Sequence, residues 1–207
     1  MNTMAPIAES NTIFDTAKNI YTYTSFSDLL SVLLMEGKTT GENHSKEYLH
    51  YAKLNLQRMH RWDKTFELRE DVVERINTAP HQNWWVITEG WCGDSAQNLP
   101  AIQKMVQTSE GKIKLNIILR DENPEIMNQY LTNGHSRSIP ILVAFDPQGN
   151  QLFRWGPRPQ PAQELLQKWK DNPVPMPFEE FELEMHTWYT RDKGNALQDE
   201  ILHLMGN

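Results

Sequence analysis

Apolar side chains recur at helical spacing through the first 80 residues of the chain. Residues 25–35 contain a dense apolar stretch, and Gly37 follows it as a residue that commonly ends a helix. Residues 45–62 carry one apolar stripe, at Leu49, Ala52, Leu56 and Met59. A third helix is expected over residues 68–78. The pattern therefore predicts a helical N-terminal region that packs on the rest of the protein, preceded by an irregular arm over residues 1 to about 20.

After Pro80 the pattern changes to short aromatic and β-branched runs that alternate with helical stretches. Strands are expected over residues 84–88, 114–119, 141–145 and 151–155. Helices are expected over residues 92–108, 124–131 and 161–170. A helical crossover joins the first two strands and makes them parallel, whereas the short turn at 146–150 makes the last two an antiparallel hairpin. The predicted fold class is α/β, with a mixed four-stranded sheet flanked by helices.

The chain after residue 171 has a different character. Residues 172–177 are rich in proline and predict a stiff, extended linker. Residues 171–207 hold eight acidic and two basic side chains, and the acidic run 179–184 is expected to be a solvated face. A helix is expected over residues 187–205, interrupted at Gly194. Three parts are thus predicted: an N-terminal helical extension (1–80), an α/β domain (81–171) and an acidic C-terminal extension (172–207).

Composition narrows the classes of function. The 207 residues include 27 acidic and 20 basic side chains, and this net charge of −7 argues against nucleic-acid binding. No apolar run approaches the ~20 residues that span a bilayer, and the first ten residues do not resemble a secretory signal. The single cysteine, Cys92, excludes an intrachain disulfide and a cysteine-based structural zinc site. A reducing, cytoplasmic location is expected, with no membrane association, metal or cofactor. The oligomeric state stays open.

Cys92 falls at the point where a predicted strand turns into a predicted helix. Unpaired N–H groups and the helix dipole favour a thiolate at such a position, and commonly lower the pKa of a thiol from ~8.5. Gly93 and Ser95 are short and are expected to leave the sulfur accessible, and the Ser95 hydroxyl can donate to a thiolate. Asp94 would either oppose the thiolate by charge repulsion or cap the helix and point to solvent. The net pKa of Cys92 is left open.

The run Trp91-Cys92-Gly93-Asp94-Ser95 resembles the W-C-G-P-C active site of thioredoxins, with serine in place of the second cysteine. Pro100 lies eight residues after the cysteine, where thioredoxins have a proline that kinks the helix. Residues 137–145 resemble the stretch that carries the cis-proline opposite the active site, and residues 153–156 resemble the last strand with its closing glycine. The resemblance covers about residues 80–171.

The resemblance implies a substrate groove between Cys92 and a cis Ile139–Pro140 peptide bond. In thioredoxins this proline exposes the backbone of the preceding residue, which can pair with an extended substrate as a short added strand. Arg137 can offer its charge to a carboxylate such as those of glutathione. The residues expected to contact substrate are Trp91, Gly93, Asp94, Ile139 and Pro140.

Two departures from the thioredoxin pattern shape the expected activity. Ser95 replaces the resolving cysteine, so a mixed disulfide on Cys92 must wait for an outside thiol such as glutathione. Val86 stands where thioredoxins have a buried acid that assists proton transfer to the second cysteine. We therefore expect monothiol thiol-disulfide exchange, with Cys92 and Ser95 as catalytic residues and with thiols or disulfides of proteins or of glutathione as partners. The alternative is a redox-inactive module that uses the same groove to hold a protein partner.

Overall fold

The computed structural model describes residues 12–174 and 176–206, which form an α/β protein built on one four-stranded sheet. The order of the strands is β2-β1-β3-β4. Strand β1 runs parallel to β2, and β3 runs antiparallel to both β1 and β4. The strand bounds are Gln82–Thr88 (β1), Ile113–Leu119 (β2), Ile141–Phe145 (β3) and Gln151–Trp155 (β4). The predicted fold class and the four predicted strands are confirmed.

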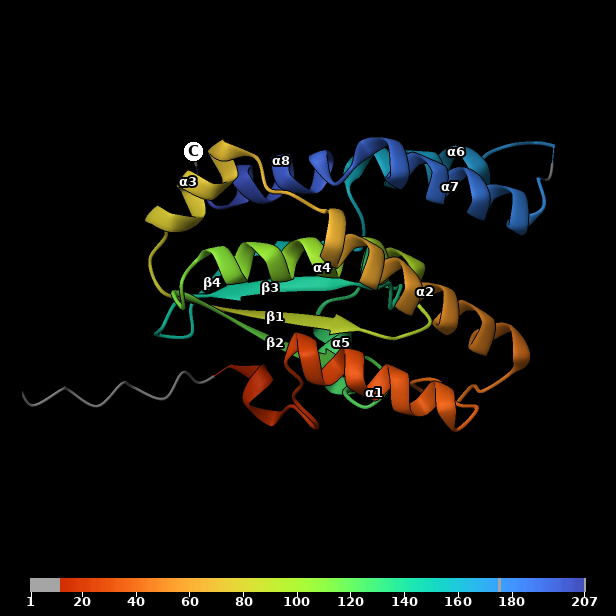
Figure 1. Cartoon of the computed structure of the whole chain (residues 1–207), viewed down its shortest axis with the longest axis horizontal. Helices are drawn as coiled ribbons and strands as arrows, with labels where there is room; N and C mark the ends of the chain where they lie inside the picture. The colour runs from red at the N-terminus through yellow and green to blue at the C-terminus, as the bar shows by residue number, and fades with distance from the viewer. Residues whose placement is uncertain (1–11, 175, 207) are drawn as a thin grey trace, which may run out of the picture.

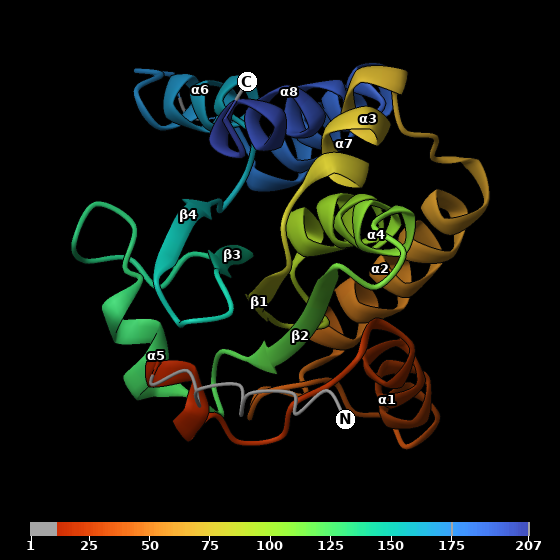
Figure 2. The same cartoon turned by 90° about the vertical axis from the view of Figure 1, so that its left-hand side faces the viewer.

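Helices cover both faces of the sheet (Figures 1 and 2). In Figure 2, α2 and α4 lie over one face, and α5 lies over the other. The six helices expected between residues 25 and 170 are all present, with ends within three residues of the predicted ones. The helix bounds are Ile13–Thr16 (η1, a short 3-10 helix), Tyr23–Met35 (α1), Lys46–Thr65 (α2), Glu70–Thr78 (α3), Gly93–Thr108 (α4), Pro124–Gln129 (α5), Gln160–Lys170 (α6), Phe178–Asp192 (α7) and Asn195–Leu204 (α8).

The irregular arm predicted for residues 1–20 is only partly open to comparison, because residues 1–11 lie outside the described residues. Ile13–Thr16 is helical, which the prediction missed. Phe14 anchors this turn, because its buried ring stacks on Trp85 with centroids 5.0 Å apart. Packing of this ring helps to hold the segment against the sheet.

The alternation of side chains along β1 divides the core between the two faces of the sheet. Trp84 and Val86 point to the face covered by α4, where they belong to the larger hydrophobic cluster. Ile87 points to the opposite face and packs in the second cluster. This period of two is what a strand dictates. Cys92 belongs to the second cluster, so the end of that core sets the surroundings of the thiol.

Both predicted extensions contribute side chains to the larger core. Leu30 of α1, Met59 of α2 and Ile76 of α3 are buried in the same cluster as the sheet residues, and so are Leu197 and Ile201 of α8. Burying each such side chain contributes about 1.5–3 kcal/mol. The extensions are thus packed parts of one core, while the exact domain boundaries at residues 80 and 171 stay a prediction.

The C-terminal extension differs from the prediction. The helix expected from residue 187 begins at Phe178 instead, after Pro177 as N-cap, and Gly194 separates it from α8. The acidic run therefore lies in the first two turns of α7, where negative charge complements the helix dipole. Most of its carboxylates are exposed, but Phe181 is buried and stacks on Trp169 with ring centroids 4.7 Å apart. That anchor explains why the run is helical.

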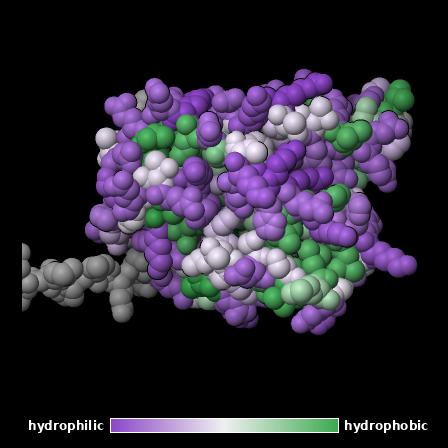
Figure 3. Space-filling view, viewed as in Figure 1, coloured by the Kyte–Doolittle hydropathy of each residue, from purple (hydrophilic) through white to green (hydrophobic). Residues whose placement is uncertain are grey.

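Hydrophilic residues predominate on the face shown in Figure 3, and hydrophobic residues gather mainly at its lower right, over α1 and α2. Val32 and Met35 of α1 are among the exposed apolar side chains. Within residues 12–174 and 176–206, no helix combines the length and apolar character needed to cross a membrane.

Gly156, which follows β4, is expected to be intolerant of substitution. Its φ is 115°, and a Cβ at this position would lie 2.2 Å from the carbonyl oxygen of Pro140. We expect Gly156→Ala to lower the free energy of unfolding by about 3 kcal/mol or more, because a clash with backbone adds to the conformational strain. Gly111→Ala is the matched control, since Gly111 has φ 88° but open space around it, and should cost only about 1–2 kcal/mol. Equal losses in urea unfolding would contradict this argument.

Candidate active site

The turn between β1 and α4 positions Cys92 as the N-cap of α4. The Cys92 N–H donates to the carbonyl of Glu89 (3.2 Å), and the Cys92 carbonyl accepts the first helical hydrogen bond from Ala96 (3.2 Å). The backbone of Cys92 is therefore fixed on both sides. The predicted start of this helix near Cys92 is confirmed.

The segment before β3 lies directly opposite the thiol. The Ile139–Pro140 peptide bond is cis. The Cys92 S–H donates a hydrogen bond to the carbonyl oxygen of Ile139, with 3.4 Å between sulfur and oxygen. Cys92 and Ile139 were predicted to face each other across a groove, and the fold brings them into contact.

The expectation of an accessible sulfur is wrong for this structure, because Cys92 is buried and only 8% exposed. Ile139 covers one side of the thiol. The imidazole of His186 in α7 packs against the neighbouring Gly93 so closely that a Cβ on Gly93 would lie 3.0 Å from His186 Cε1. Cys92 still lines a surface pocket of about 370 Å³, together with Trp91, Gly93, Asp94 and Ile139. A small ligand in this pocket would therefore lie beside Cys92.

Burial, and after it the negative charge of Asp94, raises the pKa of the Cys92 thiol to about 11. The hydroxyl and N–H of Ser95 and the charge of Arg158 act in the opposite direction, but they are weaker. The helix start does not lower this pKa because the sulfur is desolvated, and desolvation penalises the thiolate. Cys92 is therefore a neutral thiol at pH 7.

Ser95 lies one helical turn after Cys92 and is buried. Its Oγ has no hydrogen-bond partner among the residues that the structure describes. The neutral Cys92 thiol is engaged with Ile139 instead. Donation from Ser95 to a thiolate stays a prediction for the ionised state of Cys92, in which a buried hydroxyl without a partner would gain one.

Asp94 neither caps α4 nor points to solvent, so the second alternative given for it is wrong. Its side chain is 13% exposed and forms an ion pair with Arg158, whose Nε lies 3.0 Å from Oδ2. The hydroxyl of Tyr189 in α7 donates to Asp94 Oδ1 (2.7 Å). The carboxylate turns inward because the C-terminal extension and the segment after β4 supply these two donors. The predicted repulsion of a Cys92 thiolate by Asp94 agrees with the raised pKa.

A chain of side-chain hydrogen bonds ties α2, α4 and α7 together beside the thiol. Trp62 Nε1 donates to Gln97 Oε1 (2.6 Å), which orients the amide so that Gln97 Nε2 donates to His186 Nδ1 (2.9 Å). Burial lowers the pKa of His186 to about 4, so the imidazole is neutral at pH 7. The proton of the neutral ring is therefore on Nε2, the nitrogen nearer to Gly93 and Glu182.

Trp91 forms one side of the pocket, as the resemblance implied, and it is held by two neighbours. Tyr48 of α2 packs against it with ring centroids 5.2 Å apart. The guanidinium carbon of Arg120 lies 4.7 Å from the centre of the Trp91 ring. Such cation–π contacts stabilise by about 0.5–2 kcal/mol. The indole of Trp91 at the rim of the pocket is therefore held in place by Tyr48 and Arg120.

Sequence reasoning missed the residues of the site that come from outside the motif. Arg158, His186 and Tyr189 lie 64 to 95 positions along the chain from the residues that they bind, and no local pattern marks them.

Sequence reasoning also missed Glu89, a buried acid in the turn before Cys92. Burial raises the pKa of this carboxyl group to about 7. Glu89 Oε1 accepts from the N–H of Asp121 (2.9 Å), whereas Oε2 has no partner in the described part of the chain. A buried acid is thus present near the active-site turn, although Val86 occupies the position where thioredoxins carry one.

In the described residues, no three His, Cys, Asp or Glu side chains come together in a way that could hold a metal ion.

Comparison with known proteins adds a family match. Residues 41–170 match the family model described as Thioredoxin, so the match includes α2 and α3 and extends beyond the boundary expected at residue 80. Thioredoxin 1 of Nostoc sp. is 40% identical over 55 residues, and thioredoxin of Synechocystis sp. is 38% identical over 55 residues. These stretches make up 27% of this chain and 48% of either relative, so the chain spans about half the length of the curated relatives it matches.

Two solved structures share the fold over most of the chain. A protein of unknown function from Pseudomonas aeruginosa has a TM-score of 0.54 and 16% identity, and the match covers 89% of this chain and 97% of that one. An HIV epitope scaffold has a TM-score of 0.52 and 18% identity, with 89% and 98% covered. At these identities the likeness extends to the fold and not to the activity.

Proposed function

This chain belongs to the thioredoxin family, and we propose that it performs monothiol thiol-disulfide exchange through Cys92. The observation that carries the proposal is the position of the thiol. Cys92 caps α4, lies 3.4 Å from the backbone carbonyl of Ile139 and lines a pocket that opens to the surface. Ile139 offers backbone groups beside the sulfur, which suits a substrate that binds in an extended conformation.

The exchange has two steps. The Cys92 thiolate attacks one sulfur of a disulfide, whose S–S bond breaks, and the other half leaves as a thiolate and takes up a proton. A mixed disulfide now links Cys92 to the bound half. An external thiolate then attacks the sulfur of that half, and the bond to Cys92 breaks. The cycle consumes one disulfide and one thiol and releases one of each, so no separate oxidant is needed.

An external thiol has to complete the cycle because Cys92 is the only cysteine of the chain. Ser95 stands where a resolving thiol would stand, and its hydroxyl cannot form a disulfide. A pocket of about 370 Å³ is large enough for a small peptide thiol such as glutathione. Glutathione would be supplied by a reducing compartment such as the cytoplasm, the location expected from the single cysteine.

The raised pKa of Cys92 slows thiol-disulfide exchange, and it therefore favours a second candidate function. A thiol with a pKa of about 11 has about one molecule in ten thousand ionised at pH 7, and only the thiolate is nucleophilic. A redox-inactive module that holds a protein partner in the groove would need no ionisation of Cys92. The two functions differ in whether the folded protein forms a mixed disulfide.

The pH dependence of mixed-disulfide formation tests the proposal. We expect 2-hydroxyethyl disulfide, which is uncharged, to form an adduct on Cys92 at a rate that rises about tenfold per pH unit from pH 7 towards pH 10. The sign follows from the raised pKa, because the thiolate fraction keeps increasing until the pH reaches about 11. The adduct is measured by intact-protein mass, and glutathione should remove it.

The same protein unfolded in urea is the control, since its profile should level off above about pH 8.5, the ordinary pKa of a thiol. Cys92→Ser should form no adduct. If the folded protein forms no adduct while the unfolded protein does, the exchange proposal is wrong and the binding module takes its place.

A further inference from the structure

The pocket beside Cys92 is lined by charges of both signs that come from different parts of the fold. Two arginines, here called the basic wall, are Arg120 after β2 and Arg137 before β3. Two glutamates, here called the acidic wall, are Glu47 of α2 and Glu182 of α7. Tyr48 of α2 and Arg120 of the basic wall both pack against Trp91.

The basic wall has positive charge that is available to a ligand. Arg120 Nη1 donates to the backbone carbonyl of Arg137 (3.4 Å), which keeps the two residues adjacent. Arg120 also pairs with Asp121 (2.8 Å). Arg137 Nε donates to the neutral amide of Asn128 (3.0 Å), and no acid of the described residues lies within ion-pair distance of it. An arginine without an acidic partner in a pocket favours a carboxylate ligand.

A third arginine of the pocket, Arg158, is not free in this way. Asp94 accepts hydrogen bonds from its guanidinium, and both side chains are largely buried. Arg158 therefore acts on the thiol and on Asp94, and the basic wall is limited to Arg120 and Arg137.

Among the residues that the structure describes, no Lys or Arg lies within ion-pair distance of the acidic wall. Glu182 lies 3.6 Å from His186 Nε2, but that imidazole is neutral at pH 7. Burial raises the pKa of Glu182, and the charges of Arg58 and His50 lower it only in part. Tyr51 lines the same pocket as these two carboxylates. Burial raises the pKa of Tyr51, and the negative charges of Glu182 and Glu47 add to the shift. A ligand ammonium group would relieve that concentration of negative charge.

We propose that the two walls select a small peptide thiol that carries both an ammonium group and carboxylates, the charge pattern of glutathione, as the molecule that resolves a mixed disulfide on Cys92. This inference rests on the proposed exchange function. A ligand with charges of one sign meets attraction at one wall and repulsion at the other, whereas a zwitterionic peptide meets attraction at both. A neutral thiol meets neither.

The experiment compares four thiols on one adduct. Cys92 is first converted to its hydroxyethyl mixed disulfide with 2-hydroxyethyl disulfide, and the adduct is then resolved by glutathione, 2-mercaptoethanol, cysteamine or mercaptoacetate. Each rate is divided by the rate of the same thiol with free 2-hydroxyethyl disulfide, which removes differences in thiol pKa and nucleophilicity. We expect the normalised rate with glutathione to exceed each of the others by about tenfold or more.

Variants assign the effect to each wall. Arg137→Gln should reduce the advantage of glutathione several-fold and should raise the normalised rate with cysteamine. Glu182→Gln should reduce the advantage of glutathione as well, but should raise the rate with mercaptoacetate instead. Arg191→Gln and Glu184→Gln remove exposed charges of α7 that do not line the pocket, and should leave all four rates unchanged. These opposite responses to cation and anion cannot arise from a general loosening of the fold.

The outcomes separate this inference from the function that it rests on. If the hydroxyethyl adduct never forms on the folded protein, the exchange function fails and the inference fails with it. If the adduct forms but the four normalised rates agree within about twofold, or if the wall variants do not shift cysteamine and mercaptoacetate in opposite directions, the exchange function stands and selection by charge is wrong.

Discussion

Replacing Asp94 with asparagine should raise the rate at which iodoacetamide alkylates Cys92 at pH 7 by about tenfold or more. Asp94 is the largest charge-based cause of the raised pKa of this thiol. Removing its charge stabilises the thiolate, and it also leaves Arg158 without its ion-pair partner, so that the positive charge of Arg158 acts undiminished on the sulfur. Both effects lower the pKa and increase the thiolate fraction at neutral pH.

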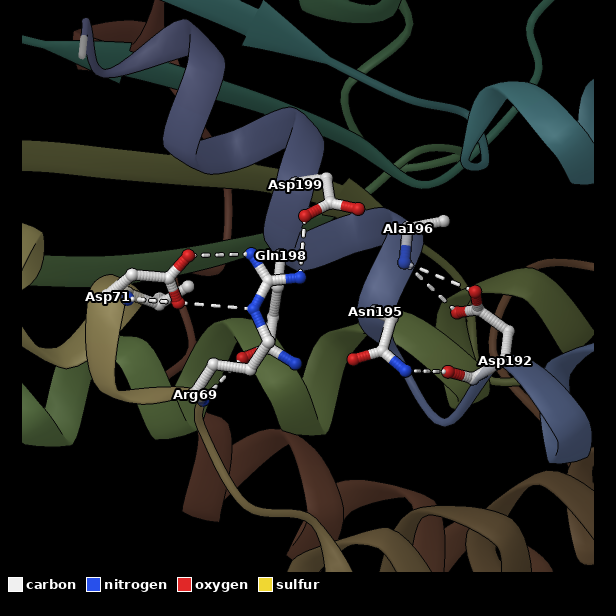
Figure 4. Close-up of polar contacts among 8 residues, drawn as sticks. Arg69, Asp71, Asp192, Asn195, Ala196, Gln198 and Asp199 are labelled. Carbon is white, nitrogen blue, oxygen red and sulfur yellow. Dashed lines mark hydrogen bonds and ion pairs between the residues drawn. The ribbon is translucent and has the colours of Figure 1, made fainter.

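The pH profile of alkylation distinguishes this electrostatic effect from a simple opening of the pocket. A lower pKa moves the bend of the profile to lower pH, whereas better access multiplies the rate by the same factor at every pH. Asparagine keeps an acceptor for the Tyr189 hydroxyl, so the contact with α7 is retained. Asp199→Asn is the matched control because Asp199 pairs with Arg69 at α8, as Figure 4 shows. An unchanged or slower alkylation of Asp94→Asn would contradict the role given to Asp94.

Replacing Ser95 with cysteine should convert a persistent mixed disulfide into one that resolves itself. The hydroxyethyl adduct on the natural protein has no internal thiol to attack it, since Cys92 is the only cysteine. A thiol at position 95 would lie one helical turn away, near enough that the present hydroxyl already influences the pKa of Cys92. Because the attack becomes intramolecular, we expect release of the hydroxyethyl thiol without added thiol to accelerate by about a hundredfold or more.

Intact-protein mass after the reaction provides the readout, because the variant should lose the adduct together with two hydrogen atoms and contain an internal disulfide. Thr108→Cys places a second thiol at the last residue of the same helix, and its adduct on Cys92 should persist. If Ser95→Cys keeps its adduct as long as the natural protein does, then the surroundings of Cys92 oppose deprotonation of the new thiol. The apolar side chain of Val86 and the charge of Asp94 would then be the features responsible.

The fold followed from the sequence because local patterns specify its elements. Alternation in β1 and the period of three and four residues in α2 depend only on neighbours in the chain, and they place Trp84 and Met59 in the core. The acidic run obscures the start of α7 in the sequence, because its charges are typical of a solvated segment. Phe178, Phe181 and Met185 recur at intervals of three and four, a helical stripe that was there to be found.

The candidate site could be predicted from the sequence only in part, and the reason differs. The motif around Cys92 is local, so its place at the start of α4 followed from sequence. Burial of the thiol depends in part on Ile139, which the fold brings from far along the chain. The sequence left the net pKa of Cys92 open, because a helix start lowers the pKa of a thiol whereas burial raises it. In the folded protein burial is the largest cause, and the pKa is raised.

The contribution of α7 to the pocket has a consequence for how this protein is compared with its relatives. The family match ends at residue 170, whereas Glu182, His186 and Tyr189 follow it. The sulfur thus lies in the part of the chain that matches the family, whereas α7 lies beyond the match and lines the pocket through Phe178 and Glu182. A relative with the same motif but a different C-terminal segment would keep the nucleophile, while the lining of its pocket would differ. Similarity at the motif is therefore a poor guide to shared substrates.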